Sequence, residues 1–161
     1  MDANDLVELE AIKRVKYRYM RTLDQKLWDE MATCFTDDAV AAYSGGKYRY
    51  EGREAILEFL STSMGAETFL SAHRVHQPEI DLTSPTTATG TWAMDDIVVM
   101  TDWNLTIRGA AFYEDRYERG GDGRWRIAHT GYTRTYELMM SLDDLPSLRF
   151  TANRWAPQPA S

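Results

Sequence analysis

The spacing of apolar residues changes once along this chain, and that change constrains the fold more than any other feature. From residue 6 to about residue 63, apolar side chains recur every three or four positions, as in amphipathic helices. After about residue 67 they alternate with polar ones, as in half-buried strands. Helices followed by a run of strands predict an α+β domain.

We expect three helices in the first part of the chain. The second covers Lys26 to Phe35, and the third opens at Gly52-Arg53-Glu54. Tyr19 lies on the apolar stripe of the first helix, so its hydroxyl group points inward and needs a polar partner. That stripe consists of Leu6, Leu9, Ile12, Val15, Tyr19 and Leu23.

The second part of the chain predicts long antiparallel strands. Ser44-Gly45-Gly46 joins two short apolar runs and predicts a hairpin. Gly120-Gly121-Asp122-Gly123 predicts a turn before the last strand. Helices against one face of such a curved sheet would form a cone with one open end. The predicted strands are Ala39–Tyr43, Lys47–Tyr50, Thr68–Val75, Glu79–Leu82, Ala88–Met100, Leu105–Glu118 and Trp125–Tyr136.

The 161 residues suit one domain, which we place at residues 1–145. Residues 146–161 form a tail in which Pro146, Pro157 and Pro159 oppose a further strand or long helix. The charged N-terminus, MDANDLVELEAIKR, matches no signal or transit peptide, and no apolar run approaches the ~20 residues of a membrane span. We therefore expect a soluble, cytoplasmic protein without a membrane partner.

Charge and cysteine content exclude several functions. The net charge of -7 argues against nucleic acid as a partner, because binding phosphates needs clustered basic residues. The basic residues of the first helix are more simply read as a solvated face than as a functional patch. They are Lys13, Arg14, Lys16, Arg18 and Arg21. The single cysteine, Cys34, excludes an internal disulfide and a cysteine-based zinc site.

Two ionisable residues fall on apolar strand faces. Asp96 shares its face with Trp92, Met94, Val98 and Met100, where a carboxylate is costly to bury unless it is paired. This placement fits either a functional site or a structural ion pair.

His73 alternates with apolar and small neighbours, namely Phe69, Ser71 and Val75. It is either a satisfied core histidine or an interior base. His76 has the opposite parity, and His129 shares a face with Trp125, so both are weaker candidates.

The known motifs for other chemistries are absent from the sequence. The three histidines show no HExxH spacing, and no dinucleotide-binding or phosphate-binding glycine loop is present. The serines lack the context of a nucleophile elbow. General acid–base chemistry by His, Asp and Tyr side chains remains, which needs neither a metal nor a cofactor.

Four segments carry a resemblance to a known family. They are LEAIKRVKYRYMRTLDQKLWDEMATCFTDDAV, YEGREAILEFL, AHRVHQPEIDL and YERGGDGRWRIAHTGYTR. With them the chain resembles the SnoaL-like and scytalone dehydratase group of the nuclear transport factor two-like superfamily, from residue 6 to about residue 136. The resemblance implies a cone-shaped α+β fold, and it implies much less about the substrate, because this fold hosts enzymes and non-enzymes.

The resemblance also implies a catalytic set. Dehydratases and dehydrochlorinases of this group share an Asp–His dyad, which Asp24 and His73 match in place. Tyr19, five residues before the aspartate, and Asp96 match the pattern of bile-acid dehydratase, and Arg134 is the nearest counterpart of a further arginine. The second histidine of scytalone dehydratase has no counterpart here.

The implied function is cofactor-independent elimination of water from a hydrophobic, ring-containing small molecule. Alternatives are an isomerase or polyketide cyclase with the same acid–base residues, or a binding protein without catalysis. Beside Arg134, the expected wall of the substrate pocket is Trp28, Tyr43, Phe59, Phe69, Trp92, Met94, Val98, Ala111, Tyr113 and Tyr132.

The outer face of the predicted sheet is more apolar than a monomer requires. Ile97, Val99 and Phe112 all fall on it. An exposed apolar face of this kind predicts a homo-oligomer, either a dimer or a trimer.

Overall fold

The computed structural model describes residues 2–156 and contains the three expected helices. They are α1 (Ala3–Asp24), α2 (Trp28–Ala32) and α3 (Arg53–Met64), so α2 is shorter at both ends than the sequence predicts. The carboxylate of Asp2 caps α1 by accepting hydrogen bonds from the backbone amides of Asn4 and Asp5. None of the described helices combines the length and the hydropathy that a membrane span needs.

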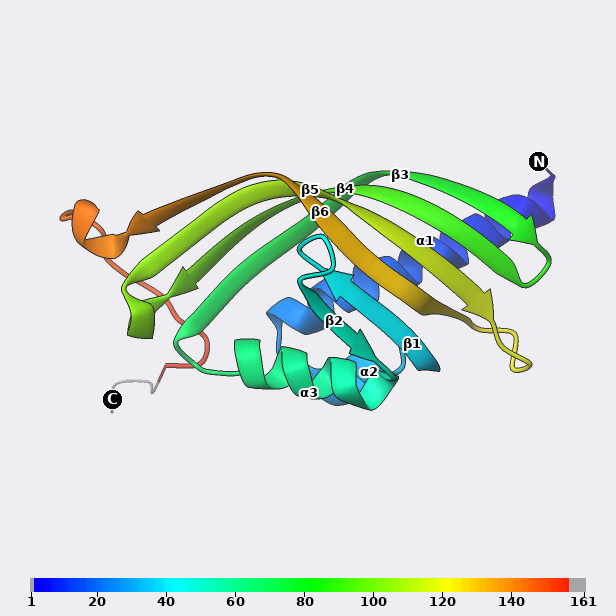
Figure 1. Cartoon of the computed structure of the whole chain (residues 1–161), viewed down its shortest axis with the longest axis horizontal. Helices are drawn as coiled ribbons and strands as arrows, with labels where there is room; N and C mark the ends of the chain where they lie inside the picture. The colour runs from blue at the N-terminus through cyan, green and yellow to red at the C-terminus, as the bar shows by residue number, and fades with distance from the viewer. Residues whose placement is uncertain (1, 157–161) are drawn as a thin grey trace.

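Within the described residues, six strands form one open, curved sheet in the order β2-β1-β6-β5-β4-β3. The sheet arches over α1, while α2 and α3 lie toward its open side (Figure 1). This arrangement confirms the predicted α+β cone. The strands are β1 (Phe35–Tyr43), β2 (Tyr48–Glu51), β3 (Phe69–Ser84), β4 (Thr87–Met100), β5 (Leu105–Arg119) and β6 (Trp125–Ser141).

One strand pairing differs from the expected antiparallel sheet. β1 pairs with β6 in parallel, whereas every other neighbouring pair is antiparallel, including the predicted β1–β2 hairpin. Parallel neighbours need a long connection between them. Here the connection contains β2, α3 and three long strands, so a local sequence pattern could not reveal the pair.

The two strands predicted between residues 68 and 82 are one strand, β3. Its register against β4 shifts between His76 and Glu79. Gln77 in that interval has φ of 45°, and Pro78 has no backbone N–H to donate. A bulge therefore interrupts the alternation without ending the strand. β6 also runs further than predicted, to Ser141.

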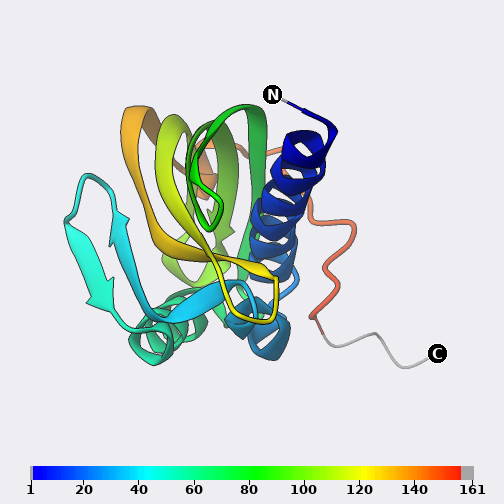
Figure 2. The same ribbon diagram turned by 90° about the vertical axis from the view of Figure 1, so that its right-hand side faces the viewer.

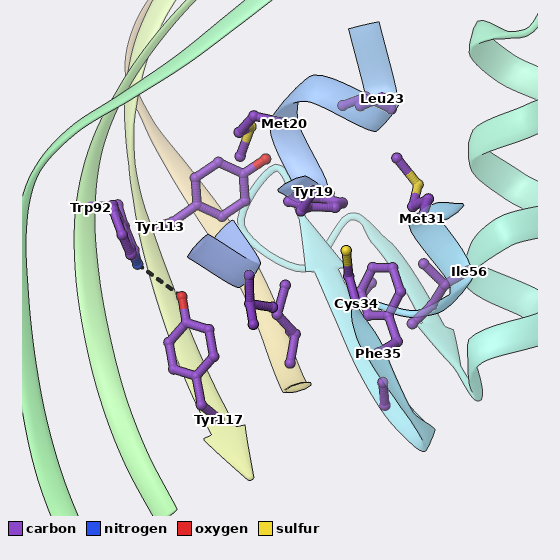
Figure 3. Packing of buried hydrophobic residues seen from close by; sticks show 14 of the residues in the cluster. Tyr19, Met20, Leu23, Met31, Cys34, Phe35, Ile56, Trp92, Tyr113 and Tyr117 are labelled. Carbon is purple, nitrogen blue, oxygen red and sulfur yellow. Dashed lines mark hydrogen bonds between the residues drawn. The ribbon is translucent and has the colours of Figure 1, made fainter. Parts of the chain in front are cut away.

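The core lies between α1 and the concave face of the sheet (Figure 2). Its largest fully buried aromatic residues are Trp92, Tyr19, Tyr113 and Tyr117, and the smaller Phe35 is fully buried as well. The indole N–H of Trp92 donates to the hydroxyl of Tyr117 across 2.9 Å (Figure 3). Aromatic residues thus fill the closed part of the cone.

A buried ion pair ties α1 to the sheet. The ammonium of Lys16 lies 2.8 Å from a carboxylate oxygen of Asp115 on β5, and both side chains are fully buried. The hydroxyls of Tyr117 and Thr130 donate to the same carboxylate across 2.6 and 2.7 Å. Both carboxylate oxygens of Asp115 therefore have hydrogen-bonding partners, as a buried charge requires.

The described part of the tail, residues 146–156, contains neither helix nor strand. It returns toward the helices: the side-chain amide of Asn153 donates to the carbonyl of Glu67, and the ammonium of Lys26 lies 4.8 Å from the ring centre of Trp155. Pro157 and Pro159 lie outside the described residues.

Candidate active site

The end of α1 meets the beginning of β3 through Asp24 and His73. Nδ1 of His73 lies 2.7 Å from Oδ1 of Asp24, and the backbone N–H of His73 donates to Oδ2 across 2.8 Å. The hydroxyl of Ser71 donates to Oδ1 across 2.8 Å. Because a carboxylate only accepts hydrogen bonds, Nδ1 of a neutral His73 carries the proton and Nε2 keeps a free lone pair.

The surroundings of Asp24 favour its charged form. Burial alone would raise the pKa of this carboxyl, but the hydrogen bonds and the charge of His73, with the bond from Ser71, outweigh burial and lower it. Asp24 is thus a fixed anion at neutral pH. It can orient the His73 ring and stabilise the imidazolium that proton uptake would create.

Asp96 lies on the other side of the same imidazole. One of its carboxylate oxygens is 3.9 Å from Nε2 of His73. Arg134 on β6 binds both oxygens of Asp96, at 2.7 and 2.9 Å. Burial would lower the pKa of the Arg134 guanidinium, but Asp96 outweighs it and raises the pKa. The charge on the apolar face of β4 is therefore paired in a bidentate geometry.

A pair of tyrosine hydroxyls supplies neutral polar groups. The hydroxyl oxygens of Tyr19 on α1 and Tyr43 on β1 lie 2.8 Å apart. Burial raises the pKa of both phenols above their ordinary value. One of the two hydroxyls donates its proton to the other in this hydrogen bond. The proton of the second hydroxyl can then be donated to a ligand oxygen.

These groups surround an interior cavity of about 120 Å³. A dry apolar cavity of roughly 150 Å³ can hold benzene, so this space suits one ring more closely than several. His73 and Asp96 form its ionisable wall. The described residues that line it are Tyr19, Leu23, Tyr43, Tyr48, Phe59, Leu60, Met64, His73, Met94, Asp96, Tyr113 and Tyr132.

Several residues expected at the pocket wall do not line this cavity. Arg134 lies beside Asp96, and Asp24, expected in the catalytic set, lies behind His73. Trp92 and Ala111 are buried in the core instead, while Phe69 packs beneath the ammonium of Lys26.

Two further expected wall residues also lie elsewhere. Val98 is buried on the inner face of β4, beyond Asp96 along the strand, and Trp28 packs against the core from the start of α2. Strand parity indicates which side a residue faces. It does not indicate the level along the strand at which the cavity lies.

Four lining residues were missed by sequence reasoning, as was the support from Ser71. Leu23 belongs to the predicted stripe of α1, and Leu60 and Met64 follow the helical spacing of α3, so a signal for them existed. Tyr48 lies on the short strand β2 and is 40% exposed. Because β2 has only four residues, its sequence pattern is too short to predict which face of the strand Tyr48 occupies.

The described residues contain no group of three or more His, Cys, Asp or Glu side chains that could hold a metal ion.

The family follows from comparison with known proteins. A sequence model of the SnoaL-like domain matches residues 4–131. The chain belongs to the SnoaL-like domain family. This membership confirms the resemblance drawn from the four sequence segments.

Solved structures of this fold include enzymes and a protein of unknown function. A candidate scytalone dehydratase from Novosphingobium aromaticivorans is 25% identical with a TM-score of 0.78, covering 86% of this chain and 91% of its own. A hexachlorocyclohexane dehydrochlorinase from Novosphingobium barchaimii is 21% identical with a TM-score of 0.77, covering 87% and 94%. A protein of unknown function from Mycobacterium tuberculosis is 24% identical with a TM-score of 0.70, covering 91% and 79%.

Proposed function

We propose that this SnoaL-like protein is a cofactor-independent lyase that eliminates water from a small β-hydroxy carbonyl compound. The observation that carries the proposal is the position of the His73 ring. Its Nδ1 is held by Asp24, and its Nε2 lies toward Asp96, with both His73 and Asp96 lining the cavity. This is the geometry of an oriented general base beside a substrate space.

In the proposed first step, Nε2 of His73 takes a proton from the carbon next to the substrate carbonyl. The electron pair of the broken C–H bond forms an enolate, and Asp24 stabilises the imidazolium. The Tyr19–Tyr43 pair donates a hydrogen bond to the enolate oxygen. Such a bond is worth more in a site from which solvent is excluded.

In the second step, the enolate electron pair forms the carbon–carbon double bond as the β C–O bond breaks. The leaving hydroxyl takes a proton, which the imidazolium of His73 can supply, and departs as water. Asp96, whose two oxygens are bound by Arg134, accepts a hydrogen bond from a substrate hydroxyl and so orients it. His73 then returns to its neutral form.

The volume of the cavity limits the size of the substrate that we propose. About 120 Å³ between tyrosine and phenylalanine rings favours a single-ring compound over a steroid-like or polyketide-like one. The flat walls supplied by Tyr113, Tyr132 and Phe59 would pack against such a ring.

The test is incubation of the full chain with a panel of single-ring β-hydroxy ketones, with products followed by mass spectrometry. We expect loss of water with the wild-type protein. His73→Ala and Asp24→Asn should each lower the rate by roughly 10²-fold or more, since general base catalysis contributes on that scale.

A matched control is available on the outer face of the sheet. His76 also contacts an aspartate, Asp95, but both side chains are about half exposed and neither lines the cavity. His76→Ala should leave the rate unchanged. Full activity in both His73→Ala and Asp24→Asn would contradict the proposed dyad. A product of unchanged mass would instead support the isomerase or cyclase alternative.

A further inference from the structure

A second hollow, of about 670 Å³, opens on the outside of the molecule and is lined by five arginines. Among residues 2–156, none lines both the interior cavity and this hollow. We call it the arginine groove. It lies between α1 and the turn that joins β5 to β6, shown in yellow in Figure 2, and it extends to the starts of α3 and β6.

The arginines converge from separate parts of the chain. Arg14 and Arg18 come from α1, Arg53 from the start of α3, Arg124 from the turn after β5, and Arg126 from β6. A gathering of this kind is unexpected in a chain of net charge -7. The structure also places the basic residues of α1 in different surroundings, whereas the sequence indicated that they form one solvated face.

The other basic residues of α1 are already occupied. Lys16 is buried against Asp115, Lys13 pairs with Glu10, and Arg21 pairs with Glu30. Only Arg14 and Arg18 of this set line the groove. The positive charge of the groove is therefore a product of the tertiary structure.

The negative charges around the groove do not balance the positive ones. Asp37 pairs with Arg53 at 2.6 Å, Asp122 with Arg126 at 2.7 Å, and Glu30 lies 3.9 Å from Arg18. Within residues 2–156, neither Arg14 nor Arg124 forms an ion pair, and both are exposed. One of these three carboxylates, Glu30, also binds Arg21, and Glu8 beside Trp125 is paired with Arg119. Arg14 and Arg124 therefore remain to meet a ligand.

A ligand could also displace the carboxylates from the existing ion pairs. The side chain of Asp37 is 89% exposed, and a surface ion pair of that kind contributes little. Guanidinium groups bind phosphate oxygens in a planar, bidentate geometry. Between the arginines, the floor contains Ala11, Val15 and Trp125, which offer apolar contact.

We propose that the arginine groove binds an organic phosphate, with the phosphate groups between Arg14 and Arg124 and the organic part against the apolar floor. The volume of about 670 Å³ falls within the range of small-molecule sites. This proposal does not rest on the proposed lyase chemistry, because the described linings of the two sites have no residue in common.

The test is isothermal titration calorimetry of the full chain at low salt with inorganic pyrophosphate and with ADP as probes. We expect dissociation constants below about 1 mM that weaken as salt is added, because salt screens the attraction. ADP should bind more tightly than pyrophosphate because it alone can contact the apolar floor.

The variant Arg14→Ala/Arg124→Ala should weaken both ligands at least about tenfold, since each loses charge-assisted hydrogen bonds. The matched control is Arg108→Ala/Arg116→Ala, which removes two exposed arginines of β5 that do not line the groove. Its dissociation constants for both probes should stay within about twofold of the wild-type values, because these arginines form no hydrogen bonds to a ligand in the groove. All four substitutions are at exposed positions, and a thermal melt checks that each variant folds.

Three results would overturn the proposal. They are no heat of binding with either probe, equal loss of affinity in the two double variants, or unchanged affinity in Arg14→Ala/Arg124→Ala. Equal affinity for pyrophosphate and ADP would overturn the proposed contact between the organic part of the ligand and the apolar floor.

Discussion

Asp24 illustrates how one residue combines a structural and a chemical role. Its carboxylate accepts three hydrogen bonds from Ser71 and His73, so it fixes the start of β3 against the end of α1 as well as orienting the imidazole. Periodicity could not predict this role, because Asp24 ends its helix and belongs to no apolar stripe. Family resemblance supplied it. Tyr19, His73 and Asp96, by contrast, could be placed from periodicity alone.

The lowered pKa of Asp24 predicts a pH-dependent contribution to stability. A carboxyl whose pKa falls on folding stabilises the native state fully above its unfolded value of about 3.9 and loses that contribution as the pH falls through the folded value. Asp24→Asn should therefore lower the free energy of unfolding by about 1–2 kcal/mol at pH ~7, with the difference shrinking below about pH 4. Urea unfolding at both pH values measures it.

The control for this prediction is Asp29→Asn, because Asp29 is an exposed aspartate on α2. It should change the free energy of unfolding by less than about 0.5 kcal/mol at either pH. An equal effect of both substitutions would show that the hydrogen bonds of Asp24 do not stabilise the fold.

At the scale of elements, the Lys16–Asp115 pair joins α1 to β5, and the hydroxyl of Thr130 extends the network to β6. Breaking one side of a buried pair leaves an uncompensated charge. Lys16→Met should therefore lower the free energy of unfolding by about 3–5 kcal/mol. Adding Asp115→Asn should restore more than half of that loss, because it removes the unpaired buried charge. The amide oxygen can accept from one of the hydroxyls of Tyr117 and Thr130, and the amide N–H can donate to the other.

A double-mutant cycle, measured by denaturant unfolding at neutral pH, isolates the coupling between the two residues. Additive losses in Lys16→Met and Asp115→Asn would contradict the pairing. The sequence could not predict this network, because a lysine among the basic residues of a helix has the same local pattern whether it is buried or solvated.

The register of Arg134 is a second element-scale feature that local patterns miss. The pairing of β5 with β6 shifts between Ala110 and Ala111, immediately before Ala111 meets Arg134. A shift of one position changes which side chains reach the cavity. The resemblance suggested the arginine, but its bidentate contact with Asp96 depends on that irregularity.

At the scale of the whole molecule, an apolar region on β5 and β6 stays exposed. Phe112 is 52% exposed, Tyr136 is 54% exposed and Leu138 is 61% exposed, and all three lie on the same face of the sheet. Exposed apolar area of this kind is typical of an interface. We therefore retain the homo-oligomer as an expectation, with a dimer and a trimer as the possible states.

Light scattering after size-exclusion chromatography tests the expected assembly. The wild type should show a multiple of the 18.5 kDa chain mass, and Phe112→Lys/Leu138→Lys should shift it to the monomer, because burying two unpaired charges is costly. Thr62→Lys adds a charge on the exposed side of α3 and should leave the mass unchanged. A monomeric wild type would contradict the expectation.

The bulge in β3 has a consequence for the phase of the whole strand. Before it, odd-numbered residues such as His73 and Val75 face inward, and after it, even-numbered Ile80 and Leu82 pack against the core. Because of this one extra residue, the side chains from Glu79 to Leu82 face the opposite way from the one that simple alternation would give them, up to a second register shift between Leu82 and Ser84. Deleting Gln77 would restore simple alternation, and it would force either Ile80 and Leu82 outward or His73 out of the cavity.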